Sequence, residues 1–401
     1  MKSHITAIAL FSFSAAAVAL YPAIQNDSRT LPTEIVPLVM QINQQHQARI
    51  EVVFVLDTTG SMSGLIQAAK DNIWSIASSM ASAKNKPEIK MGLVAYRDRG
   101  DAYVTRTLDL SDDLDSMYAA LMDFKAEGGG DGPESVNQAL HDAVSKMSWS
   151  RSDDVYKVVF LVGDAPPHMD YQDDVKYPQT IADAARKGIV VNTIQCGQDG
   201  ATTHRWQQMA QLSQGRYFQV GQSGNAVAVS SPFDAKLASL SRQLDDTRLY
   251  YGDAEEMESK KSKIAATDKL HENSSVMARA RRAVFNRSDS GSSNQWGSNE
   301  LVEDVSSGRV KLDDVETDDL PDALKAMSRP EQLAVLKDHA KKREALQQEI
   351  ESLATQRKQY IKTELAKRPA AKMSLDEKIY ATVREQAEEK GLLYESESAV
   401  Y

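Results

Sequence analysis

Apolar and polar positions follow two different patterns over the first half of the chain. Runs that are apolar at every position, such as Val52–Leu56 and Val158–Val162, predict strands buried on both faces. Between such runs, apolar residues recur every three or four positions, as from Leu65 to Met80, and this spacing predicts helices with one buried face. Strands and helices that alternate in this way predict an α/β fold, with a doubly wound, mostly parallel sheet flanked by helices.

These elements fill a predicted domain at residues 48–248. Strands are expected at residues 50–57, 91–96, 102–108, 156–162, 189–194 and 217–220. Helices are expected at residues 65–82, 114–124 and 136–147, and near 181–185, 206–210 and 233–244, where the last helix closes the domain.

The regular apolar pattern is lost over residues 249–325. Residues 288–298 are rich in Ser, Gly and Asn, and acidic residues gather at 313–319. A segment with so few apolar positions is typical of a flexible connector, and we expect one here, polar and acidic, with a single helix near 276–285.

Helical signals return over residues 326–395, and we expect a C-terminal α-helical region there. Ser328 and Glu331 have the spacing of a capping box, which starts a helix. An apolar seam follows, interrupted at Arg357 and formed by Leu346, Ile350, Leu353 and Tyr360. The seam predicts either a short coiled coil with a second copy, and so an oligomer, or a helical hairpin packed on itself or on the sheet domain.

The first 20 residues have the pattern of an export signal. Lys2 precedes the apolar run Ile5–Leu20, and Ala17–Ala19 is a small-x-small cleavage pattern. The alternative is an N-terminal anchor that is not cleaved, although the apolar run is short for a membrane span. We expect contact with a membrane only in that case. Residues 21–47 contain prolines and end Gln-rich, which predicts a linker. We therefore expect a periplasmic or secreted protein, or one anchored in the inner membrane.

The net charge and the single cysteine of the chain bear on its partners and on its cellular location. The chain has 401 residues and a formal net charge of −10, which argues against nucleic acid as a ligand. Its one cysteine, Cys196, excludes an intrachain disulfide. An exported chain without disulfides is more typical of a bacterial periplasm or surface than of an animal secreted protein.

Candidate chemistry gathers where the first strand ends. Asp57, Thr59 and Ser61 place one carboxylate and two hydroxyls at alternate positions, and Gly60 permits a tight turn between them. Oxygen ligands without sulfur or imidazole suit a hard cation. The sequence therefore predicts a divalent metal site at the carboxyl end of a central strand, where open α/β sheets bind ligands.

This Asp-x-Thr-x-Ser pattern resembles the metal-ion-dependent adhesion site of the von Willebrand factor A (vWA) domain family. Two further segments resemble that family in the same order along the chain: Gly128–Glu134, the second metal loop, and Val158–Asp164, the fourth strand with its terminal aspartate. The resemblance covers residues 48–248 and implies a Rossmann-like sheet.

The resemblance also implies the ligand set. Thr59 and Ser61 would bind the ion directly, while three carboxylates, those of Asp57, Asp131 and Asp164, would act largely through water. Mg²⁺ is the expected ion, with Mn²⁺ or Ca²⁺ as alternatives. An open coordination position would accept a Glu or Asp side chain of a protein partner.

Asp131 departs from the family pattern, because many members carry threonine there. Each like-charge pair a few ångströms apart costs about 4 kcal/mol at an effective dielectric near 20, so a cation is expected in the resting state. A third carboxylate makes the site more negative. We therefore expect higher metal affinity and weaker attraction for an acidic partner than in a threonine-type site.

The function predicted from the sequence is an exported, metal-dependent protein-binding module. The alternative is a periplasmic scaffold or assembly factor whose helical tail makes the main contact; an Asp57→Ala variant would keep its partner only in that case. Metal-assisted hydrolysis ranks third, because the carboxylates are occupied and no general base has a suitable position. We expect no enzymatic activity.

Overall fold

The computed structural model describes residues 48–130, 132–224, 229–367 and 374–395. The predicted export signal at residues 1–20, the linker at 21–47 and the predicted ligand Asp131 lie outside the described residues. None of the described helices is long and apolar enough to cross a lipid bilayer.

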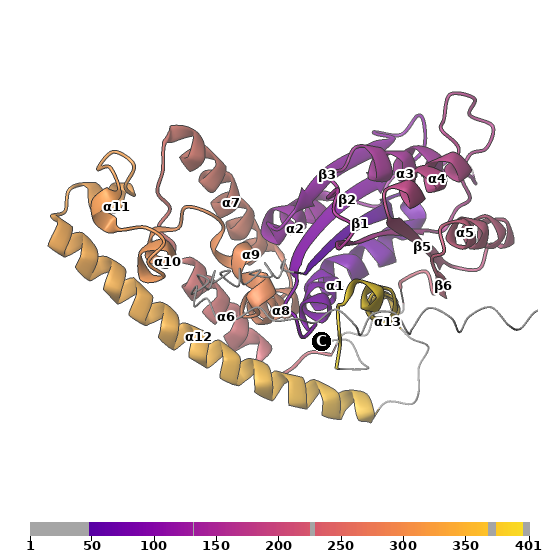
Figure 1. The fold of residues 1–401 in the computed structure, drawn as a ribbon. Helices are drawn as coiled ribbons and strands as arrows, with labels where there is room; N and C mark the ends of the chain where they lie inside the picture. Colours follow the sequence, from indigo (N-terminus) through magenta and orange to yellow (C-terminus); the bar gives the residue numbers. More distant parts are fainter. Residues whose placement is uncertain (1–47, 131, 225–228, 368–373, 396–401) are drawn as a thin grey trace, which may run out of the picture. The chain divides into compact units, whose positions relative to one another are not determined.

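A six-stranded sheet forms the centre of the predicted domain (Figure 1). Its strands are β1 (Arg49–Asp57), β2 (Glu88–Tyr96), β3 (Thr105–Ser111), β4 (Tyr156–Gly163), β5 (Ile189–Cys196) and β6 (Tyr217–Val220). They lie in the order β3-β2-β1-β4-β5-β6, and only the β2–β3 pair is antiparallel. The predicted doubly wound, mostly parallel sheet is confirmed. The apolar runs of β1 and β4 lie side by side at its centre because both faces there are covered.

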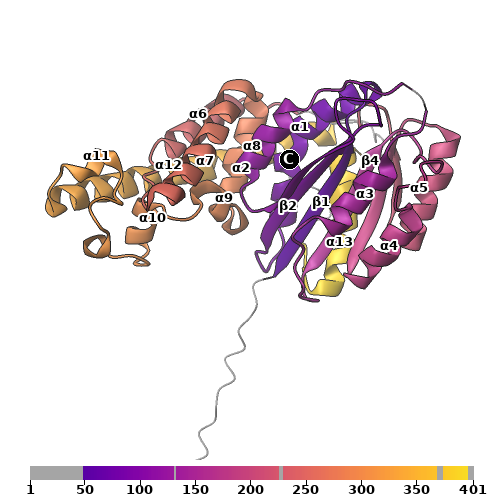
Figure 2. The same ribbon diagram turned by 90° about the horizontal axis from the view of Figure 1, so that it is seen from above.

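Helices cover both faces of the sheet, and successive side chains of each strand point alternately to one face and the other. Phe54 and Leu56 point toward α1 (Ser63–Ala81) and α2 (Leu114–Asp123). The intervening Val53 and Val55 pack against the helices of the opposite face. Figure 2 shows the helices on the two faces of the sheet. Those helices are α3 (Val136–Ser145), α4 (Tyr177–Arg186) and α5 (Gly200–Leu212).

The helix expected to close the domain exists, but it packs elsewhere. α6 (Asp234–Asp245) buries Leu237, Leu240 and Leu244 against helices that follow it in the chain. On the α1 face of the sheet, α13 (Leu375–Ala387) packs instead (Figure 1). Both helices have an apolar stripe, and a stripe alone does not specify its partner.

Polar contacts hold α13 and the residues after it on the sheet domain. Gln386 accepts a hydrogen bond from the Tyr156 hydroxyl at 2.7 Å and exchanges two with the Asn192 side chain at 3.0 Å. Beyond the helix, the Leu393 carbonyl accepts from the amide of Lys84 at 2.9 Å. The end of the C-terminal region is therefore part of the sheet domain in space.

The expected flexible connector is wrong, because residues 249–325 are largely helical. They form α7 (Ala254–Asn273), α8 (Val276–Asn286), α9 (Ser292–Trp296), α10 (Leu301–Ser306) and α11 (Asp322–Lys325). Only the helix predicted near residues 276–285 is confirmed, as α8. The apolar period is weak because buried polar side chains, paired across helices, occupy many inward positions.

Arg282 of α8 shows how such a polar position is satisfied. Its guanidinium is fully buried and forms ion pairs with Asp115 of α2 at 2.6 Å and Asp245 of α6 at 2.7 Å. Asp245 also lies 2.7 Å from the imidazole Nε2 of His271. The network links α2 of the sheet domain to α6, α7 and α8. Its charged groups are buried together, so separating them would leave uncompensated charges away from water.

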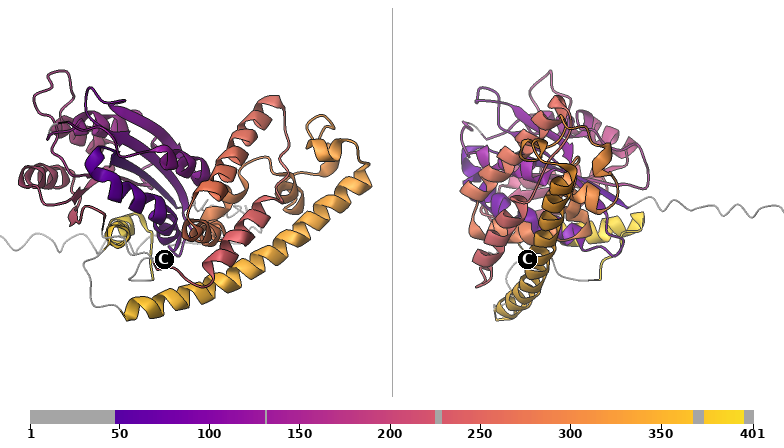
Figure 3. Two further views of the ribbon diagram at one scale, coloured as in Figure 1. Left: turned by 180° about the vertical axis from the view of Figure 1, so that it is seen from behind. Right: turned by 90° about the vertical axis from the view of Figure 1, so that its left-hand side faces the viewer.

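The apolar seam of the C-terminal region is covered within the chain. It lies on α12 (Arg329–Ala366), which runs along α6 and α10 (Figure 3). Leu346 and Ile350 are buried in the core that includes α6 and α8, and Leu353 packs against it. Tyr360 meets Phe233 edge to face, with ring centroids 6.4 Å apart. The seam therefore packs against earlier helices of the same chain.

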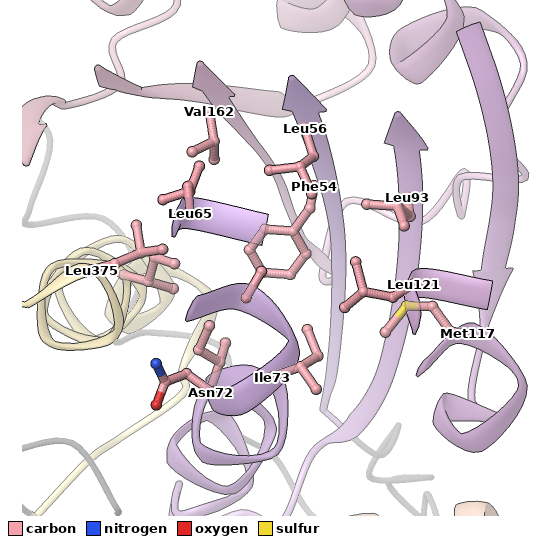
Figure 4. Close-up of a pocket in the computed structure, with 13 residues that line it drawn as sticks. Phe54, Leu56, Leu65, Asn72, Ile73, Leu93, Met117, Leu121, Val162 and Leu375 are labelled. Carbon is pink, nitrogen blue, oxygen red and sulfur yellow. The ribbon is translucent and has the colours of Figure 1, made fainter. Parts of the chain in front are cut away.

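A small apolar cavity of about 40 Å³ lies between the sheet, α1, α2 and α13 (Figure 4). Phe54 and Val162 line it from the sheet, and Leu375 lines it from α13. Asn72 also borders it, but its amide groups bond to the Ala68 carbonyl and to a buried arginine. A cavity of this kind, lined by apolar side chains, is expected to remain dry.

Candidate metal centre

The end of β1 brings the first three predicted ligands together. The carboxylate of Asp57 is fully buried, and its Oδ1 accepts hydrogen bonds from the amide and the hydroxyl of Thr59 at 2.9 and 2.7 Å. The Thr59 hydroxyl lies 3.4 Å from that of Ser61, at the start of the 3-10 turn Gly60–Met62 that leads into α1. Within the described residues, Asp57 Oδ2 has no hydrogen-bond partner.

Asp164 reaches the same place from β4. Because β1 and β4 are adjacent and parallel, with Leu56 beside Val162, their carboxyl ends meet at one edge of the sheet. A Cβ atom at Gly163 would lie 3.0 Å from Asp57 Oδ2 and 2.4 Å from the Tyr96 hydroxyl, so glycine permits this close approach.

Gln222 links Asp164 to the first turn. Its side-chain amide donates to Asp164 Oδ2 at 2.6 Å and to the backbone carbonyl of Ser61 at 3.2 Å. The structure therefore brings Asp57, Thr59, Ser61 and Asp164 together. Metal binding by these residues remains a prediction, as does the role of Asp131.

Two backbone hydrogen bonds hold the start of the glycine-rich loop against this turn. The Gly60 amide donates to the Gly128 carbonyl at 3.1 Å, and the Glu127 amide donates to the Thr58 carbonyl at 3.2 Å. Gly129 has a φ of +78°, which favours glycine, and a Cβ built there would lie 3.2 Å from that of Thr59.

Glu134, which the sequence argument did not select as a ligand, adds a further carboxyl group to the site. Its side chain is buried, and its Oε1 would lie 3.2 Å from a Cβ atom built at Gly129. Among the described residues, its Oε2 has no hydrogen-bond partner. Its amide donates to the Pro166 carbonyl at 2.9 Å, and its carbonyl accepts from the His168 amide at 3.1 Å. The backbone of Glu134 thus ties the glycine-rich loop to the loop after β4. In the sequence, the feature that could have pointed to Glu134 as a ligand was its position in the Gly128–Glu134 segment, which resembles the second metal loop.

Desolvation dominates the electrostatics of this cluster. The pKa of Asp57 is raised to about 7, chiefly by burial. The two hydrogen bonds from Thr59 lower this pKa, and the charge of Asp164 raises it. Burial, together with Asp57, raises the pKa of Glu134 to about 9. The pKa of the buried Tyr96 hydroxyl also lies well above its usual range, first because of burial. Among the described residues, no cation is a leading influence on the pKa of Asp57 or Glu134.

A hard divalent cation fits this donor set. The buried oxygens of Asp57 and Glu134 that lack partners, with the hydroxyls of Thr59 and Ser61, are the ligands that Mg²⁺ prefers. In the part of the chain that the structure describes, no three His, Cys, Asp or Glu side chains are grouped closely enough to hold a metal ion by themselves.

Comparison with known proteins places this site in a recognised domain. Residues 51–231 match the family model of the von Willebrand factor A domain. An alpha-protein kinase of Dictyostelium discoideum, vwkA, is 28% identical over 121 residues, which are 30% of this chain and 19% of the kinase. The match thus spans about a fifth of that protein's length.

Two solved structures show similar folds at low sequence identity. Proximal thread matrix protein 1 from the mussel byssus, solved with a zinc-occupied MIDAS motif, is 16% identical, covers 45% of this chain and 43% of its own, and has a TM-score of 0.35. The SpRpn10 VWA domain is 13% identical, covers 45% of this chain and 91% of its own, and has a TM-score of 0.34. By its match to the family model and its sheet of five parallel strands with one antiparallel edge strand, the chain contains a von Willebrand factor A domain.

Proposed function

We propose that this protein is an exported, metal-dependent binding module that holds an acidic side chain of a protein partner through a divalent cation, Mg²⁺ in the first place. The vWA domain is a protein-interaction module. The proposal that it binds its partner through a divalent cation rests on one observation. Asp57, Thr59, Ser61 and Asp164 converge at the carboxyl edge of the sheet, where the buried Asp57 Oδ2 lacks a hydrogen-bond donor within the described residues.

The described hydrogen bonds prepare these side chains for a cation. Because the Thr59 hydroxyl donates its proton to Asp57 Oδ1, its lone pairs are left for an electrophile. Gln222 holds the Asp164 carboxylate from the side by donating to one oxygen. A bound cation supplies the positive charge that attracts a partner carboxylate, and the exposed Ser61 leaves the site accessible from solvent.

Packing within the chain weakens the alternative scaffold function. A contact made through the apolar seam of α12 is one form of that alternative, and it is disfavoured because Leu346 and Ile350 are already buried against the chain's own helices. The metal-dependent binding function needs no such rearrangement. Export, by a signal at residues 1–20, is part of the proposal and predicts a mature protein that begins after Ala19.

Metal binding is tested first, by titrating Mn²⁺ into the purified protein and following free Mn²⁺ by electron paramagnetic resonance. We expect one saturable site, displaced by Mg²⁺, with an affinity that falls by about ten-fold or more in Ser61→Ala. Ser63→Ala is the matched control, because it removes another exposed hydroxyl, from the first residue of α1, that lies outside the motif. Equal Mn²⁺ affinity in wild type and Ser61→Ala would contradict the proposed site.

Partner binding is tested second, by capture from a periplasmic or surface extract with Mg²⁺ or with EDTA. We expect a captured protein that is lost with EDTA and is also lost with the Asp57→Ala variant. Capture that survives both changes would support a contact made by the helical region and refute metal-dependent binding.

A further inference from the structure

A second polar pocket lies at the opposite end of β4 from the candidate metal centre. It encloses about 460 Å³ and is bordered by Lys157, the second residue of β4, and by loops that precede β4 and β5. Asp164 lies seven positions after Lys157, which corresponds to about 23 Å along a strand. The two sites are therefore separate, and the pocket is not explained by the proposed metal-dependent function.

Four cationic side chains border this pocket. They are Arg151, Lys157, Arg186 and Lys187, and Asp153 is the one acidic residue among the described residues that line it. Lys157 is the least exposed, at 3%. Burying an ammonium group away from water is costly unless an anion lies near it.

Backbone carbonyls and one acidic residue outside the pocket lining satisfy three of these four cations. The ammonium of Lys157 donates to the Lys187 carbonyl at 3.0 Å, and that of Lys187 donates to the Val144 carbonyl at 2.7 Å. Arg186 pairs with Asp183 on the surface of α4. Among the described residues, Arg151 has no ion-pair partner. Positive charge in the pocket therefore exceeds the negative charge that the lining residues supply.

The acidic group nearest to Lys157 along the sheet is already engaged. Glu51 is paired in register with Lys157 on the neighbouring strand, and its Oε2 accepts a hydrogen bond from the Ser150 amide at 2.8 Å. No ion pair joins it to Lys157 within the described residues. Burial lowers the pKa of the Lys157 ammonium, although Glu51 and Asp153 oppose that shift.

Trp149 gives the pocket a rigid apolar wall. Its indole nitrogen donates to the Ala143 carbonyl at 2.8 Å, so the orientation of the ring is fixed, and the side chain is only partly buried. A fixed indole beside cations suits a ligand that has a flat apolar part next to an acidic group.

We propose that this pocket binds a small organic anion, with its carboxylate or phosphate group on Lys157 and Arg151 and its ring on Trp149. Both acidic groups are planar or tetrahedral oxygen acceptors that an ammonium and a guanidinium can bind together. The inference is independent of the metal site.

Calorimetric titration of the full chain in EDTA, at constant ionic strength, tests this proposal with three probes. Phenyl phosphate and benzoate each carry a ring with one acidic group, and inorganic phosphate carries the acidic group alone. We expect one saturable site for at least one ring-bearing probe, with an affinity about ten-fold or more above that of inorganic phosphate. The better ring-bearing probe identifies which acidic group the pocket prefers.

Variants then locate the binding. Arg151→Ala, at an exposed position, and Lys157→Met should each lower the affinity for the better probe by about ten-fold or more. Arg205→Ala, which removes a cation of α5 that does not border the pocket, should leave it unchanged. Trp149→Phe should reduce the preference for a ring-bearing probe. Absence of saturable binding by either ring-bearing probe overturns the proposal, and so does binding that Arg151→Ala leaves unchanged.

Discussion

Filling the apolar cavity under α1 and α13 should stabilise the vWA domain. Val162 lines the cavity from β4 and is 3% exposed, and Val162→Ile adds one methylene toward the empty space (Figure 4). At about 24 cal/mol per Å³, a cavity of 40 Å³ costs about 1 kcal/mol. One buried methylene contributes about 0.8 kcal/mol. We therefore expect the free energy of unfolding to rise by about 0.5–1 kcal/mol, and to fall by about 2 kcal/mol in Val162→Ala.

Urea unfolding followed by circular dichroism measures both changes. The matched control is Val158→Ile, on the same strand and in the same core, where the side chain is fully buried but does not border the cavity. There the added methylene has no space, and we expect a loss of about 1–3 kcal/mol. If Val162→Ile destabilises the protein as much as Val158→Ile does, the cavity does not exist in solution and the reasoning fails.

Four further predictions concern the metal centre and the packing of the helices. Asp131→Thr should bind Mg²⁺ more weakly than wild type, measured by calorimetry, because it removes one negative charge from the site. Glu134→Gln should weaken Mn²⁺ binding by about ten-fold, because glutamine cannot release a proton and become an anionic ligand when the ion binds. Arg282→Met should lower the free energy of unfolding by about 3–5 kcal/mol, because it removes the ion-pair partner of the buried Asp115 carboxylate and one of the partners of Asp245. Deletion of residues 368–401 should destabilise the sheet domain, and a peptide of residues 374–395 added in trans should restore part of the loss.

Each of these predictions has a result that contradicts it. Equal or tighter Mg²⁺ binding by Asp131→Thr defeats the charge argument, and unchanged Mn²⁺ binding by Glu134→Gln removes that residue from the site. A loss below about 1 kcal/mol in Arg282→Met would show that the ion-pair network is solvated. Unfolding of the deleted chain at the same urea concentration as the full chain would show that α13 does not contribute to the domain.

Acid should weaken the same ion-pair network. The arginine beside Asp115 holds the pKa of that carboxyl below its usual range, and Arg248 and Arg282 do the same for Asp245. Carboxyl groups with lowered pKa contribute stability that is complete above their unfolded value of about 4 and is lost as the pH falls through the folded values. We expect the wild-type protein to lose stability below about pH 4, and Arg282→Met to lose less over the same range. Parallel pH profiles of the two proteins would contradict this assignment.

Local pattern was sufficient for the central part of the fold. The apolar runs of β1 and β4 predicted central strands because a strand buried on both faces must be apolar throughout. The place of Asp57 and Asp164 at the carboxyl ends followed, since parallel neighbours end at the same edge of the sheet. Glu134 could not be selected in this way, because its proximity to Thr59 depends on how the glycine-rich loop folds back.

The sequence by itself therefore determined the strands, the helices of the sheet domain and the edge where acidic side chains meet. Only the tertiary structure decided which helix covers the α1 face: α6 and α13 have similar apolar stripes, yet α6 packs on α8 and α13 packs on the sheet. It also decided that residues 249–325 are ordered. The periodicity of a chain reports which residues seek burial, whereas the partner that buries them, or that neutralises a charge such as Arg282, lies far away in sequence and is set by the packing of the whole chain.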